Sequence, residues 1–198
     1  MKNLLECATV NLFDKDNIDI VALHETGHVI VMYALGLMDA FEYVTRQANT
    51  GNGTLGLTET TEDYKAELRR HQDKFANLDL LTGKGIADCV RLSRLESAKL
   101  YLPNICRLFG GGAICRYYKA QNEEMCKIDY DLIDLLLAGL GLAGTRETVL
   151  TLVDNFLNTV FVSLDLLTKT IYVNLKEEGT LNKEQVMEII RQWEEFKI

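Results

Sequence analysis

The sequence predicts a mainly α-helical protein, a helical bundle with a small β-hairpin or sheet beside one apolar helix. Beyond Thr61 the chain consists of stretches rich in Leu, Ile, Ala, Glu and Lys, and the whole sequence contains 1 proline, which is typical of helices. Residues that favour strands and turns concentrate between Phe41 and Thr58. With 198 residues, 47% of them hydrophobic, the chain can build one sizeable core. We therefore expect a single domain over residues 1–198.

The first long helix is expected from Ile18 to about Leu37. Asn17 is the expected N-cap, and Gly36 suits the C-terminal end. One polar segment, His24-Glu25-Thr26-Gly27-His28, interrupts an otherwise apolar pattern. The residues that recur at helical spacing are Ile20, Val21, Leu23, Val29, Ile30, Met32 and Tyr33.

A β-hairpin is expected after that helix. Phe41–Thr45 is rich in aromatic and β-branched residues, residues 49–53 are typical of a turn, and Thr54–Thr58 would form the second strand. The remainder should be helical. The expected helices are Glu62–Ala76, Ile86–Leu102, Asn104–Lys119, Tyr130–Leu140, Thr145–Leu175 and Asn182–Phe196, joined at Gly83, Gly110–Gly112, Gly139–Gly144 and Gly179.

Charge and cysteine content narrow the function classes. Lys plus Arg is 21 against 29 Asp plus Glu, a formal charge of −8, whereas a nucleic-acid surface usually needs the opposite sign, so we expect no nucleic-acid partner. The 5 cysteines form no C-x-x-C pair, which argues against disulfides or a thiolate zinc site. There is no signal-peptide core, and the strongest apolar run, Leu135–Gly144, is roughly half of a membrane span. We expect a cytoplasmic protein with no membrane span.

His24 and His28 are the candidate metal ligands. Residues four apart on an α-helix are separated by about 40° around the axis and about 6 Å along it, so the two imidazoles can face one ion. A catalytic zinc site uses three protein ligands and leaves the fourth position for water. Glu25, beside the first ligand, can act as general base toward that water, and Gly27 leaves room for backbone or substrate. The predicted cofactor is Zn²⁺.

The alternative is that His24 and His28 are ordinary polar residues on a helix, hydrogen-bonded or solvated, with Glu25 as a surface carboxylate. They are, however, the only strongly polar groups between Asp19 and Asp39, in a stretch that otherwise has the composition of a core helix. Burying two imidazoles and a carboxylate without partners would be costly, and a metal would satisfy all three. The metal site is therefore the preferred interpretation.

The order of features resembles the peptidase domain of the FtsH family, the membrane-bound ATP-dependent zinc proteases, over most of the chain. His24–His28 looks like the zinc-binding helix of that family, and Val44–Leu57 looks like the strand region that follows it. Leu108–Ala113 is similar to its glycine-rich helix segment, and Glu178–Glu184 resembles its closing helix-turn-helix. Many zinc proteases share the first motif, whereas the ordered set is more specific. The resemblance implies an FtsH-peptidase-like fold and zinc-dependent hydrolysis of peptide bonds.

The resemblance also suggests the third metal ligand. In the FtsH family an aspartate replaces the more common third histidine or glutamate, and Asp131, which opens a predicted helix, is at the matching position. Asp129 would then be nearer a helix cap than a ligand. The alternative for Asp131 is a carboxylate that only interacts with the N-terminus of its helix.

The chain departs from the family pattern in three places. The stretch between the hairpin and Gly110 is longer, which predicts an inserted helical segment at about residues 62–100. Cys115 stands where the family usually has glutamate after the glycine-rich turn. Leu135 replaces a small residue in the helix after Asp131. These changes are compatible with an inactive relative.

The ATPase module of the family is also absent. Gly83-Lys84 is followed by Gly85, and Leu78 occupies the first glycine position of a phosphate-binding loop, so the chain should not bind ATP in that way. Because membrane helices are not expected either, unfolding of folded substrates would require a separate ATPase or adaptor protein.

The leading interpretation is a zinc metalloendopeptidase of the HExxH type that cuts flexible or unfolded polypeptides, with His24, His28 and Asp131 as ligands and Glu25 as base. One alternative is a catalytically inactive, FtsH-peptidase-like interaction module that keeps the fold, with or without the zinc. Another is a helical bundle with a coincidental motif. If Tyr43–Arg46 forms a sheet edge, a substrate can bind there as an added strand. A homo-oligomer is a further prediction, since the FtsH domain assembles in rings.

Overall fold

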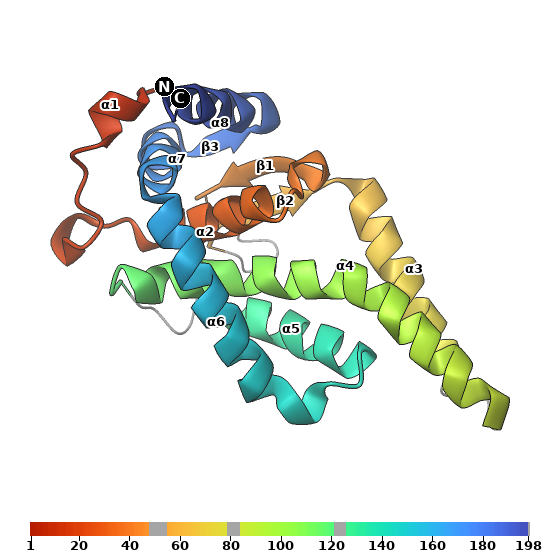
Figure 1. Ribbon diagram of the computed structural model, residues 1–198. Helices are drawn as coiled ribbons and strands as arrows, with labels where there is room; N and C mark the ends of the chain where they lie inside the picture. Colours follow the sequence, from red (N-terminus) through yellow and green to blue (C-terminus); the bar gives the residue numbers. More distant parts are fainter. Residues whose placement is uncertain (48–54, 79–83, 121–125, 198) are drawn as a thin grey trace.

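The computed structural model describes residues 1–47, 55–78, 84–120 and 126–197, which form a mainly helical protein with a small three-stranded antiparallel sheet (Figure 1). The class agrees with the sequence prediction. In chain order the elements are α1 (Leu4–Cys7), η1 (Lys15–Asn17), α2 (Ile20–Ala34), η2 (Met38–Ala40), β1 (Phe41–Thr45), β2 (Leu57–Thr60), α3 (Glu62–Leu78), α4 (Lys84–Tyr117), α5 (Lys127–Gly139), η4 (Ala143–Thr145), α6 (Arg146–Ser163), α7 (Asp165–Glu178), β3 (Thr180–Asn182) and α8 (Lys183–Phe196).

Helix α2 lies at the centre and carries the predicted metal ligands. Its N-cap is Asp19 rather than Asn17, because an Asp19 side-chain oxygen accepts a hydrogen bond of 3.0 Å from the backbone nitrogen of Ala22. Gly36 adopts a φ of +69° just after the helix, as its C-terminal end requires. Every residue from Ala22 to Met32 is buried. Because α2 packs on α4, α6, α7 and the sheet, its polar segment lies inside the protein.

Strand β1 is the middle strand of the sheet, whose order is β2-β1-β3. Val44 of β1 pairs with Thr58 on one side and with Leu181 on the other. The prediction that Tyr43–Arg46 forms a sheet edge is therefore wrong, because β3 covers that side. The open edge nearest α2 belongs to β2 instead.

The other β predictions hold in part. The strand at Phe41–Thr45 is confirmed, whereas the second strand begins at Leu57 rather than Thr54. The predicted turn at residues 49–53 lies outside the described residues. Strand β3 falls in the predicted turn between the last two helices; its last residue, Asn182, also caps α8 in a capping box with Gln185.

Helix α4 runs unbroken where the sequence predicts two helices and a glycine joint. Pro103 lies inside it and removes one backbone donor without ending the helix. The glycines are packing positions rather than breaks. A Cβ added to Gly27 would lie 2.5 Å from the carbonyl oxygen of Gly110, and one added to Gly110 would lie 2.7 Å from Cγ2 of Val31. These two glycines let the backbones of α2 and α4 touch.

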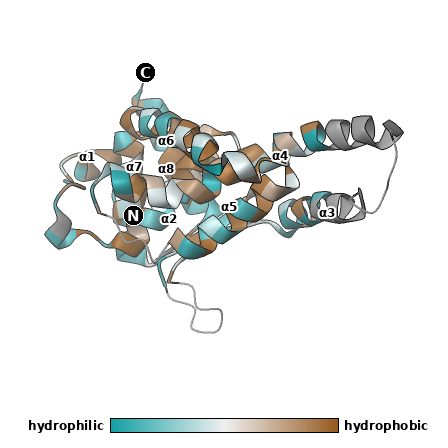
Figure 2. Ribbon diagram, turned by 90° about the horizontal axis from the view of Figure 1, so that it is seen from below, coloured by the Kyte–Doolittle hydropathy of each residue, from teal (hydrophilic) through white to brown (hydrophobic). Residues whose placement is uncertain are grey.

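The predicted helix Thr145–Leu175 is two helices, α6 and α7, which meet at Leu164 with a bend of 84°. Their buried residues join those of α2 and α4 in one core cluster, and hydrophobic residues gather where these helices meet (Figure 2). In the described part of the chain, no single helix has both the length and the apolar composition to cross a membrane, although the bent pair α6–α7 passes when both helices are taken together.

Helix α3 lies beside the N-terminal part of α4 (Figures 1 and 2). These helices occupy most of residues 62–100, where the sequence predicts an inserted helical segment. The predicted joint at Gly83 lies outside the described residues. That the segment is an insertion relative to the FtsH family stays a prediction.

The substitution Gly110→Ala tests the close crossing of α2 and α4. The new methyl would lie 2.7 Å from Cγ2 of Val31 and 2.9 Å from the carbonyl oxygen of Gly27, so the helices must separate. We expect the free energy of unfolding in urea to fall by roughly 1–3 kcal/mol, despite the higher helix propensity of alanine. The control is Gly144→Ala, whose added Cβ has nothing within 4 Å; equal losses in both variants would contradict the packing role.

Candidate metal centre

The polar segment of α2 places three side chains, His24, Glu25 and His28, inside the protein. Each is buried, with 4%, 5% and 4% of its surface exposed. Their burial excludes a solvated helix surface, whereas polar side chains held by hydrogen bonds alone stay the alternative to a metal site. The two imidazoles lie on the same side of α2, and their Nε2 atoms are 3.1 Å apart.

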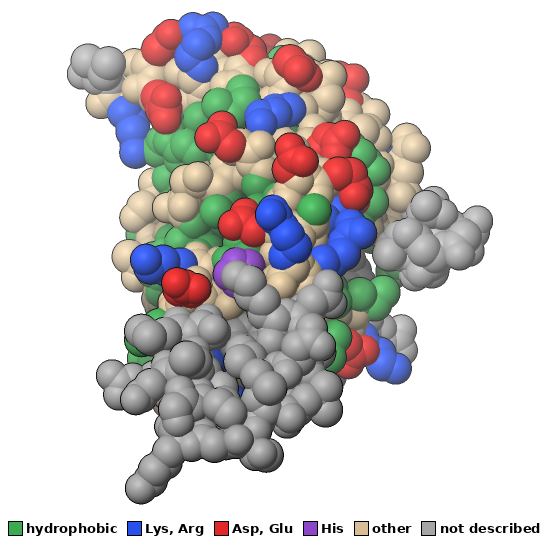
Figure 3. Space-filling view, turned by 90° about the vertical axis from the view of Figure 1, so that its right-hand side faces the viewer, with side chains coloured by type: hydrophobic (Ala, Val, Ile, Leu, Met, Phe, Trp, Pro, Cys, Tyr) green, Lys and Arg blue, Asp and Glu red, His purple; other side chains and the backbone are tan. Residues whose placement is uncertain are grey.

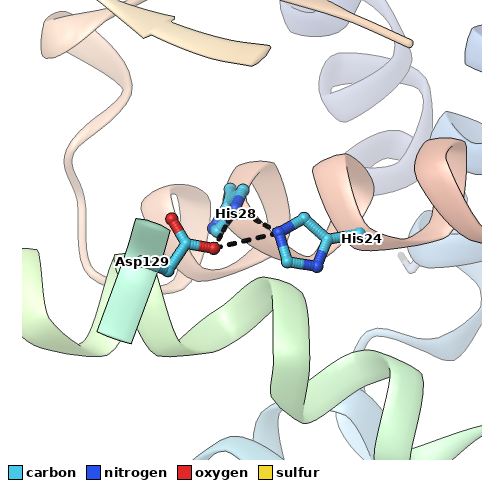
Figure 4. Close-up of side chains that lie close together, drawn as sticks. All are labelled: His24, His28 and Asp129. Atoms are coloured by element: carbon cyan, nitrogen blue, oxygen red, sulfur yellow. Dashed lines mark hydrogen bonds and ion pairs between the residues drawn. The ribbon is translucent and has the colours of Figure 1, made fainter. Parts of the chain in front are cut away.

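Asp129 of α5 completes a three-residue group with His24 and His28 (Figure 4). Its Oδ2 lies 3.0 Å from Nε2 of His24 and 3.5 Å from Nε2 of His28. These three atoms converge on one point from two helices that are far apart in the sequence. Among the histidine, cysteine and acidic side chains of the described residues, these three are close enough together to hold a metal ion.

The spacing of the three atoms fits a zinc ion. With bonds of about 2.0–2.1 Å in tetrahedral geometry, neighbouring ligand atoms are separated by roughly 3.3 Å. The separations of 3.0, 3.1 and 3.5 Å lie on both sides of that value. One ion can therefore reach all three atoms with small shifts, and a fourth position remains for water or substrate.

The structure corrects the predicted third ligand, since Asp129, not Asp131, faces the imidazoles. Residues two positions apart on an α-helix are separated by about 200° around the axis, so only one of Asp129 and Asp131 can point inward. Asp131 is exposed on the outer side of α5. Asp129 is not the N-cap either; α5 begins at Lys127 with Cys126 at the cap position, and Asp129 lies in its first turn.

A backbone carbonyl orients the His28 ring. Nδ1 of His28 is 2.8 Å from the carbonyl oxygen of Arg107 on α4. A carbonyl oxygen can only accept a hydrogen bond, so Nδ1 carries the proton and Nε2 presents its lone pair to the metal position. This support of a ligand by a second hydrogen bond is the usual arrangement in metal sites.

The His24 ring is held by shape rather than by a hydrogen bond at Nδ1. A Cβ added to Gly111 would lie 2.6 Å from both Cε1 and Nε2 of His24, so only glycine leaves space for the ring against α4. Nδ1 of His24 is buried and has no hydrogen-bond partner among the described residues. The thiols of Cys115 and Cys126 lie close enough to affect the ring electrostatically. Cys115 therefore lies beside His24.

The electrostatics of the group favour a positive charge at its centre. Burial opposes ionisation of Asp129, but the neighbouring imidazoles of His28 and His24 hold the pKa of Asp129 well below its usual range. Burial likewise opposes protonation of His24, yet its hydrogen bond to Asp129 raises the pKa of His24 well above its usual value. Asp129 and His24 thus each favour the charged form of the other, and a metal cation bound at the same point would compensate the Asp129 carboxylate in the same way.

Glu25 is fixed between α2 and β2. Its Oε2 accepts a hydrogen bond of 2.8 Å from Oγ1 of Thr58, and a Cβ added to Gly56 would lie 2.8 Å from both Cγ and Oε1 of Glu25. The carboxylate is thereby held in one orientation beside the ligand group. It lines the same cavity as His24, His28 and Asp129.

That cavity has a volume of about 440 Å³. Strand β2 forms one wall, α3 and α4 form others, and α5 closes the side of Asp129. The volume lies within the range of small-molecule sites, roughly 300–1,000 Å³, which suits a few residues of a peptide. Its apolar walls are built by Leu55, Leu57, Leu68, Leu108, Ile128, Leu132 and Leu136.

Sequence reasoning missed Thr58, Arg107 and the role of Asp129. Thr58 and Arg107 act through contacts between distant segments, which no local pattern signals. His71 is partly buried, with its Nδ1 2.7 Å from Oγ of Ser97. It lies outside the group formed by His24, His28 and Asp129.

The substitution Asp129→Asn tests the corrected ligand set. Loss of the carboxylate charge should weaken zinc binding by more than about 100-fold, since even second-shell changes cost 10–100-fold. Asp131→Asn, which makes the same change two residues away on an exposed position, should leave the affinity unchanged. Competition with a chromogenic chelator measures both. Zinc affinity lost in Asp131→Asn and kept in Asp129→Asn would restore the original assignment.

Comparison with known proteins gives no relative: no family model, no curated protein and no solved structure matches this chain. The function is therefore argued from the geometry of the site.

Proposed function

We propose that this chain is a zinc-dependent metalloendopeptidase that hydrolyses flexible or unfolded polypeptides, and that its resemblance to the FtsH peptidase domain reflects that activity. The observation that carries the proposal is the convergence of His24, His28 and Asp129 on one point, with Glu25 held beside them in an open cavity. A purely structural metal site would not need an adjacent carboxylate or a cavity.

His24, His28 and Asp129 would hold the ion. A zinc ion at this point supplies a Lewis acid that lowers the pKa of water and polarises a peptide carbonyl. We assign the proton transfer to Glu25. Its Oε1 and Oε2 are the carboxylate oxygens that can take a proton from the attacking water and pass it to the departing amine.

Thr58 would be a positioning residue for this step. Its hydroxyl donates to Oε2 of Glu25, which fixes that oxygen and leaves Oε1 for the water. Because a carboxylate oxygen has a second lone pair, the hydrogen bond from Thr58 does not prevent proton transfer. Gly56 allows the close approach of β2 on which this contact depends.

The open edge of β2 supports binding of an extended substrate. Residues Leu57–Thr60 line the cavity, and β2 is hydrogen-bonded to a neighbour on one side only among the described strands. A peptide could add to the free side as a further strand, with its carbonyl groups passing the metal position. Only a flexible segment can do so, which limits the substrates to unfolded chains unless a separate ATPase or adaptor unfolds them.

The second candidate is an inactive interaction module that keeps the fold and the zinc. The observation that favours it is Nδ1 of His24, which is buried without a hydrogen-bond partner among the described residues. A ligand that lacks this support is oriented less firmly. Zinc binding without peptide hydrolysis would select this candidate.

The substitution Glu25→Gln separates the two candidates. Glutamine keeps the shape of the side chain and accepts no proton, so hydrolysis of casein by the zinc-loaded protein should fall by at least about 100-fold, within the usual contribution of a general base. Zinc content measured by atomic absorption should stay unchanged. Glu42→Gln, the same change at an exposed position on β1, is the control. Casein cleavage that survives Glu25→Gln would exclude the proposed mechanism.

A further inference from the structure

Arg107 is a cation in the cavity wall whose only side-chain hydrogen bond to the described residues goes to a neutral group. Its Nε donates to Oδ1 of Asn104 at 2.8 Å. Both residues lie on one face of α4 and line the cavity that contains His24, Glu25 and His28. The backbone carbonyl of Arg107 also accepts the hydrogen bond from His28. The Arg107 side chain therefore starts from a residue that directly contacts the ligand group.

The other cations that line the cavity are already paired. Lys65 contacts Glu59 and also Glu62, the latter at 2.9 Å, and Arg69 contacts Glu62 at 3.2 Å. On the side of the molecule where α3 lies, basic and acidic side chains stand next to one another in the same way (Figure 3). Arg107 differs from both, since none of the ion pairs among the described residues includes it.

A guanidinium without an ion-pair partner in a cavity wall can bind an anionic ligand. Burial lowers the pKa of Arg107, while Tyr64, Asp129 and Glu25 favour its charged form. These two carboxylates have other tasks, because Asp129 belongs to the ligand group and Glu25 is held by Thr58. Arginine stays charged in proteins, and Arg107 is only half-buried, so water solvates its charge when no ligand is bound. A ligand that brings an anion would pair with this charge directly.

The chemistry of the cavity indicates which anion. Guanidinium presents its donors as a planar fork that matches the two oxygens of a carboxylate. Asn104 holds Nε and so leaves the terminal nitrogens of Arg107 for a ligand. Leucine side chains, including Leu108 and Leu136, form the neighbouring walls, which suits an apolar residue beside the anion. A peptide offers both groups.

We propose that Arg107, oriented by Asn104, is a specificity residue that binds a substrate carboxylate close to the scissile bond. The carboxylate would be the C-terminus of a short peptide or an acidic side chain. This inference rests on the proposed peptidase function and adds a substrate preference to it. The preference is for short, anionic products of an earlier proteolytic step or for acidic segments of unfolded chains.

Peptide binding to the zinc-loaded Glu25→Gln variant tests the inference without requiring turnover. The probes are fluorescein-labelled Ala-Leu-Leu-Ala with a free C-terminal carboxylate or a C-terminal amide, and an amidated pair ending in Glu or Gln. Fluorescence anisotropy gives the Kd of each. We expect the carboxylate member of at least one pair to bind about tenfold or more tightly than its neutral partner, and which pair responds distinguishes a C-terminus from an acidic side chain.

Adding Arg107→Met to this background should abolish the preference, and Arg107→Lys should restore part of it because the charge remains without the fork. Arg70→Met, the same change at an exposed arginine of α3 outside the cavity, is the control. The thermal unfolding midpoint of each variant verifies folding. Equal binding of carboxylate and neutral peptides, or a preference that persists in Arg107→Met, would overturn the inference. If the zinc-loaded protein failed to cleave casein but kept the carboxylate preference in peptide binding, the proposed peptidase function would be wrong and the Arg107 inference would stand.

Discussion

The structure depends on one electrostatic constraint: two imidazoles and two carboxylates lie together in a cavity wall of a largely hydrophobic protein, and each must be compensated there. His24 and His28 are buried on a helix whose apolar residues belong to the core cluster. Their Nε2 atoms and Oδ2 of Asp129 lie so close together that a positive charge between them is the simplest arrangement that satisfies all three. The hydrogen bond to Asp129 raises the pKa of His24 above its usual value, in keeping with that preference. A divalent ion would provide that positive charge.

The helices around this group pack closely enough to hold its side chains near one another. Gly27 and Gly110 bring α2 and α4 into backbone contact, and Gly111 leaves the space that the His24 ring fills. The same helix α4 supplies the carbonyl that orients His28 and the side chain of Arg107 that faces the cavity. One helix crossing therefore sets the positions of these side chains and the shape of the cavity beside them. This coupling explains why the glycines are necessary although they lie within a regular helix.

The sequence was sufficient for the helical class, for α2 and for the pair His24 and His28, because periodicity and spacing along one helix are local properties. The sequence did not predict features that are determined by contacts between distant segments. Asp129 and Asp131 are both carboxylates near the start of α5, and only the rotation of that helix against α2 selects one. Continuity through Pro103 and pairing of β3 with β1 likewise depend on packing between distant segments. The FtsH resemblance pointed to Asp131, whereas the structure brings Asp129 next to the two imidazoles.

The most direct test of this account is crystallography of the zinc-loaded protein with anomalous data collected at the zinc absorption edge. The account predicts one anomalous peak within bonding distance, about 2.0–2.2 Å, of Nε2 of His24, Nε2 of His28 and a carboxylate oxygen of Asp129. A peak bound to other residues, or the absence of any peak in protein soaked with excess zinc, would contradict it.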